Sequence, residues 1–215
     1  MKMFLSVLLA ALSSVILLRA QPEAPTRASA IALTNADLGT VLRLYSDYTG
    51  RTLLLHPKLS RTTFNLSKES ATPTEARSLI EEALREKGIA TIADGDKFII
   101  VAPQAVVSTI KPAAPGQEAV TEKSADALIP PGMANMGGAS ENQILALYAD
   151  LLGKKLDTAE PLPQTQSPAI HFRTVTPLSK QEMIYAVKTL LTWRGIDVVP
   201  VGDNAVKAVR VPDTK

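Results

Sequence analysis

The fold of this chain is decided by two matching stretches, Leu44-Tyr45-Ser46-Asp47-Tyr48-Thr49-Gly50-Arg51-Thr52-Leu53 and Leu147-Tyr148-Ala149-Asp150-Leu151-Leu152-Gly153-Lys154-Lys155-Leu156. They align without a gap, and the second begins 103 residues after the first (147 − 44). Farther along the chain, Gly88-Ile89 matches Gly195-Ile196. Self-similarity of this kind indicates a repeated structural unit. The sequence therefore predicts that one unit is used twice.

Each stretch lies in an amphipathic helix, because apolar residues recur at positions i, i+3, i+4 and i+7 and so share one helix face. These residues are Leu38, Val41, Leu42 and Tyr45 in the first copy and Ile144, Leu147, Tyr148 and Leu151 in the second. Gly50 and Gly153 follow the helices, as glycine often does at a helix end. We expect both stripes, including the two tyrosines, to face a core rather than a ligand.

A second helix follows in each copy. In the first copy it begins at Thr72, with Pro73 at its first position and Glu75 at its third, and it ends at Gly88. Its counterpart runs from Ser179, with Glu182 at the third position, to Gly195. Ser140 and Gln143 open the first helix of the second copy in the same way. Such pairs are typical of capping boxes, which satisfy the free N–H groups of a helix start.

Residues typical of β-strands separate the helices. Alternation and β-branched residues predict strands, and Asp94-Gly95-Asp96 indicates a hairpin turn. The predicted strands are Ile31 to Thr34, Thr52 to His56, Thr62 to Leu66, Ile89 to Ala93, Lys97 to Val101, Ile196 to Val201 and Ala205 to Val211. Pro130 and Pro131 stand where the second copy should begin, so its first strand is expected to be missing or irregular. The stretch Ala105 to Ile110 is apolar enough to be a strand.

The predicted fold class is α+β, with two tandem β-α-β-β-α-β-β modules that each pack two helices on small sheets. We place a signal peptide at 1–20 and a linker at 21–30. The first module spans 31–103, a linker rich in Pro, Ala and Gly spans 104–138, and the second module spans 139–212.

The N-terminal segment predicts export. Lys2 precedes a nearly unbroken apolar run from Phe4 to Leu18, and small Ala20 precedes Gln21. This pattern is typical of a signal peptide cleaved after Ala20. An uncleaved anchor is the alternative, since Leu18 is large for its position, although the run is shorter than the roughly 20 residues that span a bilayer.

Charge and cysteine content exclude several classes of protein. The chain has 23 Lys and Arg against 21 Asp and Glu, and removal of Lys2 and Arg19 with the leader leaves 21 against 21. A neutral protein lacks the basic surface that nucleic-acid binding requires. Because cysteine is absent, the chain has neither disulfides nor a thiol nucleophile. Packing alone must stabilise it.

The order of elements and several residues resemble a known family, the secretin and TonB-receptor short N-terminal domain of periplasmic secretin rings. The resemblance covers Ile31 to Pro103 well and Gly138 to Pro212 more loosely. The residues that carry it are Asn35-Ala36-Asp37-Leu38, Val41-Leu42, Gly50, Thr62 to Leu66, Thr74-Glu75-Ala76, Leu79, Ile80, Leu84, Gly88-Ile89 and Phe98-Ile99-Ile100-Val101. Pore-forming members continue into a C-terminal barrel, whereas this sequence ends at Lys215. The resemblance therefore implies a docking or ring-forming module in the periplasm, without the secretin barrel.

No catalytic, cofactor-binding or metal-binding residue is predicted, no cofactor is expected, and the partner-binding residues are unknown. The only histidines are His56 and His171, whereas catalytic zinc usually needs three protein ligands. We expect both to be ordinary strand residues. Trp193 is expected either to cover a hairpin or to form part of an interface, where tryptophan is enriched.

The function predicted is a non-enzymatic protein-interaction or assembly module of a secretin-related secretion system, such as type II secretion, or of a type IV pilus or envelope system. Its expected partner is an envelope protein, with a secretin, another secretion or pilus component, or a second copy of the chain as candidates. No nucleic acid is expected, and membrane contact is expected only through an uncleaved leader. The alternative is a free-standing periplasmic protein that binds a small molecule or acts as a hydrolase.

Overall fold

The computed structural model describes residues 29–112, 128–158 and 169–211. We refer to residues 29–112 as the first half and to the remaining described residues as the second half. The predicted signal peptide at 1–20 lies outside the described residues, as do parts of both predicted linkers. Within the described residues, no helix combines the length and the apolar character needed to cross a membrane.

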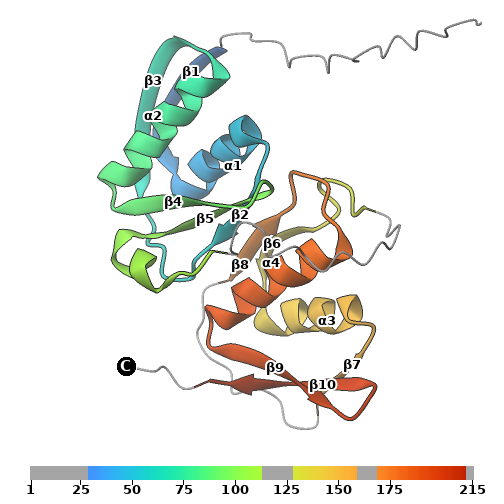
Figure 1. Ribbon diagram of the computed structural model, residues 1–215. Coiled ribbons are helices and arrows are strands. Elements are labelled where there is room, and N and C mark those ends of the chain that lie inside the picture. Colours follow the sequence, from blue (N-terminus) through green and yellow to red (C-terminus); the bar gives the residue numbers. More distant parts are fainter. Residues whose placement is uncertain (1–28, 113–127, 159–168, 212–215) are drawn as a thin grey trace, which may run out of the picture.

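The first half contains five strands and two helices in the predicted order (Figure 1). They are β1 (Ser29–Asp37), α1 (Leu38–Thr49), β2 (Thr52–Leu55), β3 (Thr63–Ala71), α2 (Pro73–Glu86), β4 (Ile89–Asp94) and β5 (Phe98–Pro103). Strand β1 pairs antiparallel with β3, while β5 lies between the parallel β2 and the antiparallel β4.

The described residues of the second half form the same order of elements. They are β6 (Asn135–Ala139), α3 (Glu141–Leu151), β7 (Lys155–Asp157), β8 (Ile170–Arg173), α4 (Lys180–Thr192), β9 (Ile196–Val201) and β10 (Ala205–Arg210). Strand β6 pairs antiparallel with β8, while β10 lies between the parallel β7 and the antiparallel β9. The fold is α+β, and both halves have the same strand pairing.

Local chemistry sets the helix boundaries where the sequence predicts them. At the start of α2, Thr72 Oγ1 accepts from the Glu75 N–H at 3.3 Å, and the Glu75 carboxylate accepts from the Thr72 N–H at 2.8 Å. The same capping box opens α3 and α4. Helix α1 ends at Gly50, whose φ of 63° is a left-handed conformation that glycine adopts without a steric penalty.

Two segments differ from the sequence predictions. The stretch Ala105 to Ile110, read as strand-like, lies mostly in the 3-10 helix η1 (Gln104–Thr109), which has no buried residue. The opening strand of the second half is present as β6 in spite of Pro130 and Pro131, because both prolines precede it. It is irregular, with a register shift between Gly137 and Ala139.

The apolar stripes form two clusters. One contains Val41, Leu42 and Tyr45 of α1 together with the buried faces of the other first-half elements. The other contains the stripes of α3 and α4, but it also includes Leu54, Phe98, Ile100 and Ala102 from the first half. The sheet β2-β5-β4 therefore has its own helices on one face and the second half on the other, an arrangement visible in Figure 1.

Candidate functional site

The boundary between the halves is an apolar contact. Leu54 is fully buried, and Ile100 and Phe98 are 1% and 5% exposed, in a cluster whose other buried members, apart from Ala102, are second-half residues. Burying a side chain of this size stabilises by about 1.5–3 kcal/mol. Separating the halves would expose all three side chains, so the described residues form one packed unit.

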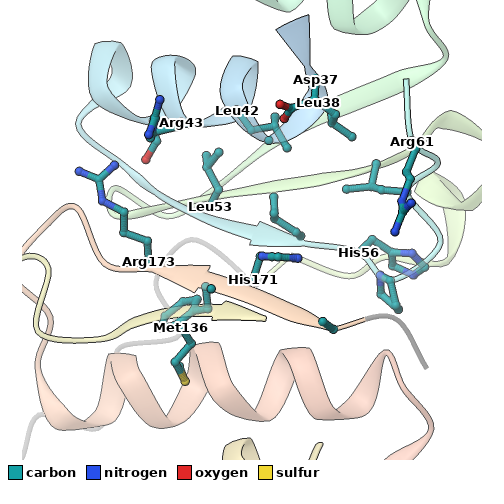
Figure 2. A pocket seen from close by; sticks show the side chains of 18 of the residues that line it. Asp37, Leu38, Leu42, Arg43, Leu53, His56, Arg61, Met136, His171 and Arg173 are labelled. Carbon is teal, nitrogen blue, oxygen red and sulfur yellow. The ribbon is translucent and has the colours of Figure 1, made fainter. Parts of the chain in front are cut away.

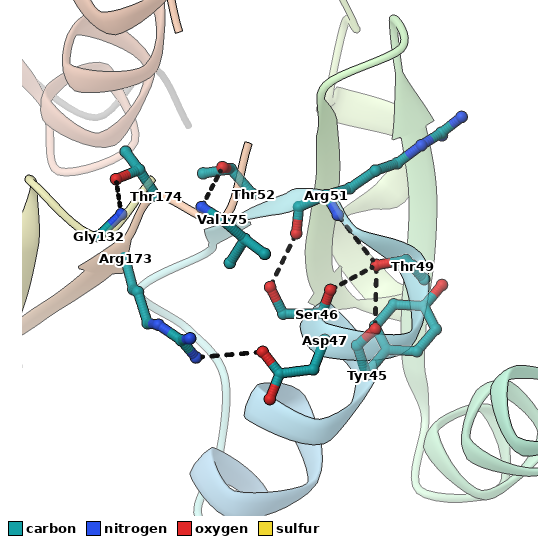
Figure 3. Close-up of polar contacts among 10 residues, drawn as sticks. All are labelled: Tyr45, Ser46, Asp47, Thr49, Arg51, Thr52, Gly132, Arg173, Thr174 and Val175. Carbon is teal, nitrogen blue, oxygen red and sulfur yellow. Dashed lines mark hydrogen bonds and ion pairs between the residues drawn. The ribbon is translucent and has the colours of Figure 1, made fainter. Parts of the chain in front are cut away.

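Polar contacts fix the register of this boundary. Lys97 on the first half pairs with Glu182 of α4 at 2.7 Å, and the Tyr185 hydroxyl donates to the Asp94 carboxylate. Figure 3 shows two further contacts, in which the Val175 N–H donates to Thr52 Oγ1 at 3.1 Å and Arg173 lies 3.4 Å from the Asp47 carboxylate. The last pair is exposed, so its free-energy contribution is small.

His56 contacts Trp193 across the same boundary. The two ring centroids are 5.3 Å apart, and His56 is 8% exposed. Its Nδ1 accepts from the Lys58 N–H at 3.2 Å, so the neutral ring carries its proton on Nε2. Burial lowers the pKa of His56, and the nearby charges of Lys58 and Arg194 lower it further. A neutral histidine therefore belongs to the contact between the halves.

A groove of about 1060 Å³ opens beside this contact. Its first wall comes from the start of α1, strand β2 and the loop between β2 and β3, and its second wall comes from β6 and β8 (Figure 2). Leu42, Leu53 and Met136 contribute apolar surface. The groove exists because β2 and β8 belong to different sheets whose edges are not hydrogen-bonded to each other among the described residues.

The lining of the groove is basic. Its charged residues are Arg43, Arg61, Arg173 and Arg194 against the single acid Asp37. The Asp37 carboxylate caps α1 by accepting from the Thr40 N–H at 2.8 Å, and this hydrogen bond lowers its pKa. The negative charge of the Asp37 carboxylate therefore interacts mainly with the N–H groups at the start of α1. The lining therefore carries a net positive charge, although Arg173 pairs with Asp47 at 3.4 Å and Arg194 interacts electrostatically with Glu141.

The structure places the residues considered in the sequence as follows. His56 directly follows β2, and the exposed His171 lies on β8. Both line the groove, although no three metal-binding side chains gather within residues 29–112, 128–158 and 169–211. Tyr45 and Tyr148 are core residues, 1% and 7% exposed. Burial and the acceptor Glu81 raise the pKa of Tyr45 to about 12. Trp193 packs at the interface between the halves.

The four arginines were missed in the sequence, because they stand at positions 43, 61, 173 and 194 and belong to no local motif. Only the packing of one half on the other brings them to one groove. A usable signal lay in β5, whose run Phe98-Ile99-Ile100-Val101-Ala102 is typical of a strand covered on both faces.

Comparisons with known proteins give partial matches. The chain matches no protein-family model and no curated protein. A solved structure described as XcpQN012 is 22% identical and matches over 37% of this chain and 37% of its own, with a TM-score of 0.34. The crystal structure of the N-terminal domain of the secretin XcpQ from Pseudomonas aeruginosa is 22% identical over 35% of this chain and 36% of that one, with a TM-score of 0.33. The chain therefore matches little more than a third of the length of these structures.

Proposed function

We propose that this protein is a non-catalytic assembly component of the cell envelope, built from two copies of a module like the secretin N-terminal domain. The observation that carries the proposal is the packed boundary between two halves with the same strand pairing. Tandem modules fused in this way present a fixed surface that neither module has alone. Such a surface suits recognition of a protein partner rather than chemistry at a single reacting atom.

The proposal includes export to the periplasm with cleavage after Ala20, and two modules at 31–103 and 139–212. Support comes from the charge and apolar pattern of the leader, from the repeated stretches that begin at Leu44 and Leu147, and from the resemblance carried by the first half. Open strand edges add further support. Strand β3 has β1 as its only sheet neighbour among the described strands, and open edges are common sites of strand addition by partners.

The test is localisation combined with crosslinking in the native cell. A C-terminally tagged full chain is recovered from cell fractions, its N-terminus is sequenced, and its crosslinked peptides are identified by mass spectrometry. We expect a periplasmic protein that begins at Gln21 and is crosslinked to an envelope protein. A cytoplasmic protein, or a strictly monomeric one with no crosslinked partner, would contradict the proposal and favour the small-molecule alternative.

A further inference from the structure

The charges of the groove between the halves are divided between its two ends. Figure 2 shows Arg43 and Arg173 at one end and Arg61 beside His56 at the other, with Leu53 and His171 between them. A single small anion could therefore contact one end but not both. A ligand that uses the whole groove has to be extended.

Two of these arginines are available to a ligand. Arg43 and Arg61 are exposed, and neither has an ion-pair partner among the described residues. Among the described residues, Arg173 has one ion pair, the exposed contact with Asp47 at 3.4 Å, which an incoming carboxylate can replace at little cost. Guanidinium groups bind carboxylates with two parallel hydrogen bonds, so the charge pattern fits carboxylates spaced along one molecule.

One wall of the groove also suits a polypeptide. Strand β2 is the last strand of its sheet, and Leu53 and Leu55 line the groove. The Thr52 N–H donates to the carbonyl of Lys97, just before β5, and the His56 N–H donates to the carbonyl of Val101 within β5, at 2.9 Å each. The alternation of a strand therefore directs the N–H and C=O groups of Leu53 and Leu55 away from β5. Extended peptides use such edges for main-chain hydrogen bonds, which small anions do not need.

We infer that this groove binds an extended acidic segment of a partner protein, with carboxylates at its two ends and apolar residues at its centre. The end carboxylates contact Arg43 with Arg173 and Arg61 respectively, and the centre lies against the partly exposed Leu55 beside the buried Leu53. This assignment rests on the proposed assembly function, because it names the chemistry of the partner.

Binding is tested with the purified full chain and three fluorescein-labelled heptapeptides, measured by fluorescence anisotropy. The first has two aspartates, three leucines and two glutamates in that order. The second replaces the acids by lysine, and the third replaces the leucines by serine. We expect the first to bind most tightly, with an affinity that falls at least tenfold between 50 mM and 500 mM salt because exposed charges are screened.

The matched variants separate the groove from net charge. The double variant Arg43→Ala/Arg61→Ala should weaken binding of the acidic peptide at least tenfold. The control Arg85→Ala/Lys87→Ala removes the same charge from exposed positions on and after α2 that do not line the groove, and it should leave binding within about twofold. Thermal unfolding of each variant checks that the fold is retained. Equal weakening by both variants, or no binding of the first peptide, would overturn the assignment.

Competition and crosslinking complete the test. If citrate or inorganic phosphate displaces the peptide at similar concentrations, the groove is a small-anion site and the inference is wrong. If the wild-type chain self-associates through the arginines, as sedimentation velocity would show, the occupant is a second copy and the inference is also wrong. If the groove variant keeps the crosslinked partner of the wild type, the groove assignment fails while the proposed function stands. If the wild type has no partner, the proposed function itself fails.

Discussion

The sheets β2-β5-β4 and β7-β10-β9 have the same strand order, but the faces that point away from their own helices differ in polarity and burial. In the first sheet Leu54 pairs with Ile100, and both side chains are buried under the second half. The corresponding parallel pair in the second sheet is Asp157 with Lys207, and both are partly exposed. One fold thus carries an apolar pair where a neighbour covers the sheet and a charged pair where solvent does. The outer face, rather than the fold, determines which half is covered.

Helices α2 and α4 also differ in the side chains that they could pack against the outer face of a sheet. Tyr185 and Trp193 of the second half stand six and fourteen residues after the N-cap Ser179, and both contact the first half. At the same distances after Thr72, the first half has Ser78 and Glu86, and both are exposed. Helix α2 therefore lacks the aromatic side chains with which the second half packs on a sheet.

The largest expected effect tests whether the two halves unfold as one unit. Leu42→Asp and Leu145→Asp place a charge at matched buried positions, 3% and 2% exposed. Each should cost several kcal/mol, comparable to the whole stability of a small domain. Because the halves share an apolar cluster, the wild type should unfold in urea in one cooperative transition, and either substitution should abolish that transition for both halves together.

Ala146→Asp is the control, because Ala146 is exposed and adjacent to Leu145; it should change the free energy of unfolding by less than about 1 kcal/mol. The expectation would be wrong if, in each core variant, the half without the substitution still unfolded in a transition of its own. That result would mean that the boundary does not couple the halves.

A reciprocal exchange sharpens the contrast between the outer faces. Ile100→Lys gives the first sheet the residue of the second and buries an amine under α4, which should cost about 3–5 kcal/mol. Lys207→Ile makes the opposite change on an open face, and should alter the free energy of unfolding by less than about 1 kcal/mol while increasing self-association. Urea midpoints and sedimentation velocity measure the two effects. Equal destabilisation by both substitutions would show that the two faces are equally covered.

Two capping carboxylates give a smaller contrast. Glu182 caps α4 and pairs with Lys97 across the boundary, whereas Glu75 caps α2 and pairs with Lys68 within the first half. Glutamine can also close a capping box, so Glu182→Gln mainly removes the charged contact and should cost about 1 kcal/mol. Glu75→Gln should cost less, because its pair is more exposed. Urea unfolding at low and high salt distinguishes them, and a larger loss for Glu75→Gln would contradict the structural role of the boundary contact.

The pH dependence of Glu75 has a definite sign. The Thr72 N–H and the Lys68 ammonium lower its pKa from 4.5 to about 2. A carboxyl whose folded-state pKa is lowered contributes stability above its ordinary value, and that contribution disappears as the pH falls toward the folded-state value. Between pH 5 and pH 2 the wild type should therefore lose more stability than Glu75→Gln, as measured by urea midpoints. Parallel curves would contradict the pKa shift.

Much of the fold could be predicted from the sequence because its signals are local. Capping residues such as Thr72 and Ser179 and the glycines after the helices determine helix boundaries within a few positions. The sequence predicts a strand where η1 lies, because a short apolar run does not distinguish a strand from a helical turn. Pro130 and Pro131 predict an interruption of the first strand of the second half, but both precede β6.

The groove could not be predicted, because it depends on which half covers the sheet β2-β5-β4. The unbroken apolar run from Phe98 to Ala102 indicates two covered faces, but it does not say that α4 covers the outer one. Arg43 and Arg173 lie 130 residues apart in the chain (173 − 43). Long-range packing creates this charge cluster, and a single sequence does not contain that information.

The smallest expected effect concerns the buried histidine at the boundary. Protonation of His56 in the folded state would place a cation against Trp193, near the charges of Lys58 and Arg194. Its folded-state pKa therefore lies below the ordinary value of 6.5, which the unfolded chain retains. Below pH 6.5 the unfolded chain takes up this proton more readily than the folded protein, so the stability that is present above pH 6.5 decreases as the pH falls.

His56→Gln removes this proton uptake, whereas His171→Gln changes the exposed histidine on the opposite wall of the groove and serves as the matched control. Between pH 7.5 and pH 5.5, the wild type and His171→Gln should lose stability more steeply than His56→Gln, by at most about 1.4 kcal/mol per pH unit for one proton. Urea midpoints at three pH values measure these slopes. The position 103 residues after His56 is Ala159 in the sequence, so a pH response specific to His56 would locate the acid sensitivity at the boundary between the halves. Equal slopes in His56→Gln and the wild type would show that His56 takes up its proton as easily in the folded protein as in the unfolded chain. The contact with Trp193 would then not shield the imidazole from solvent.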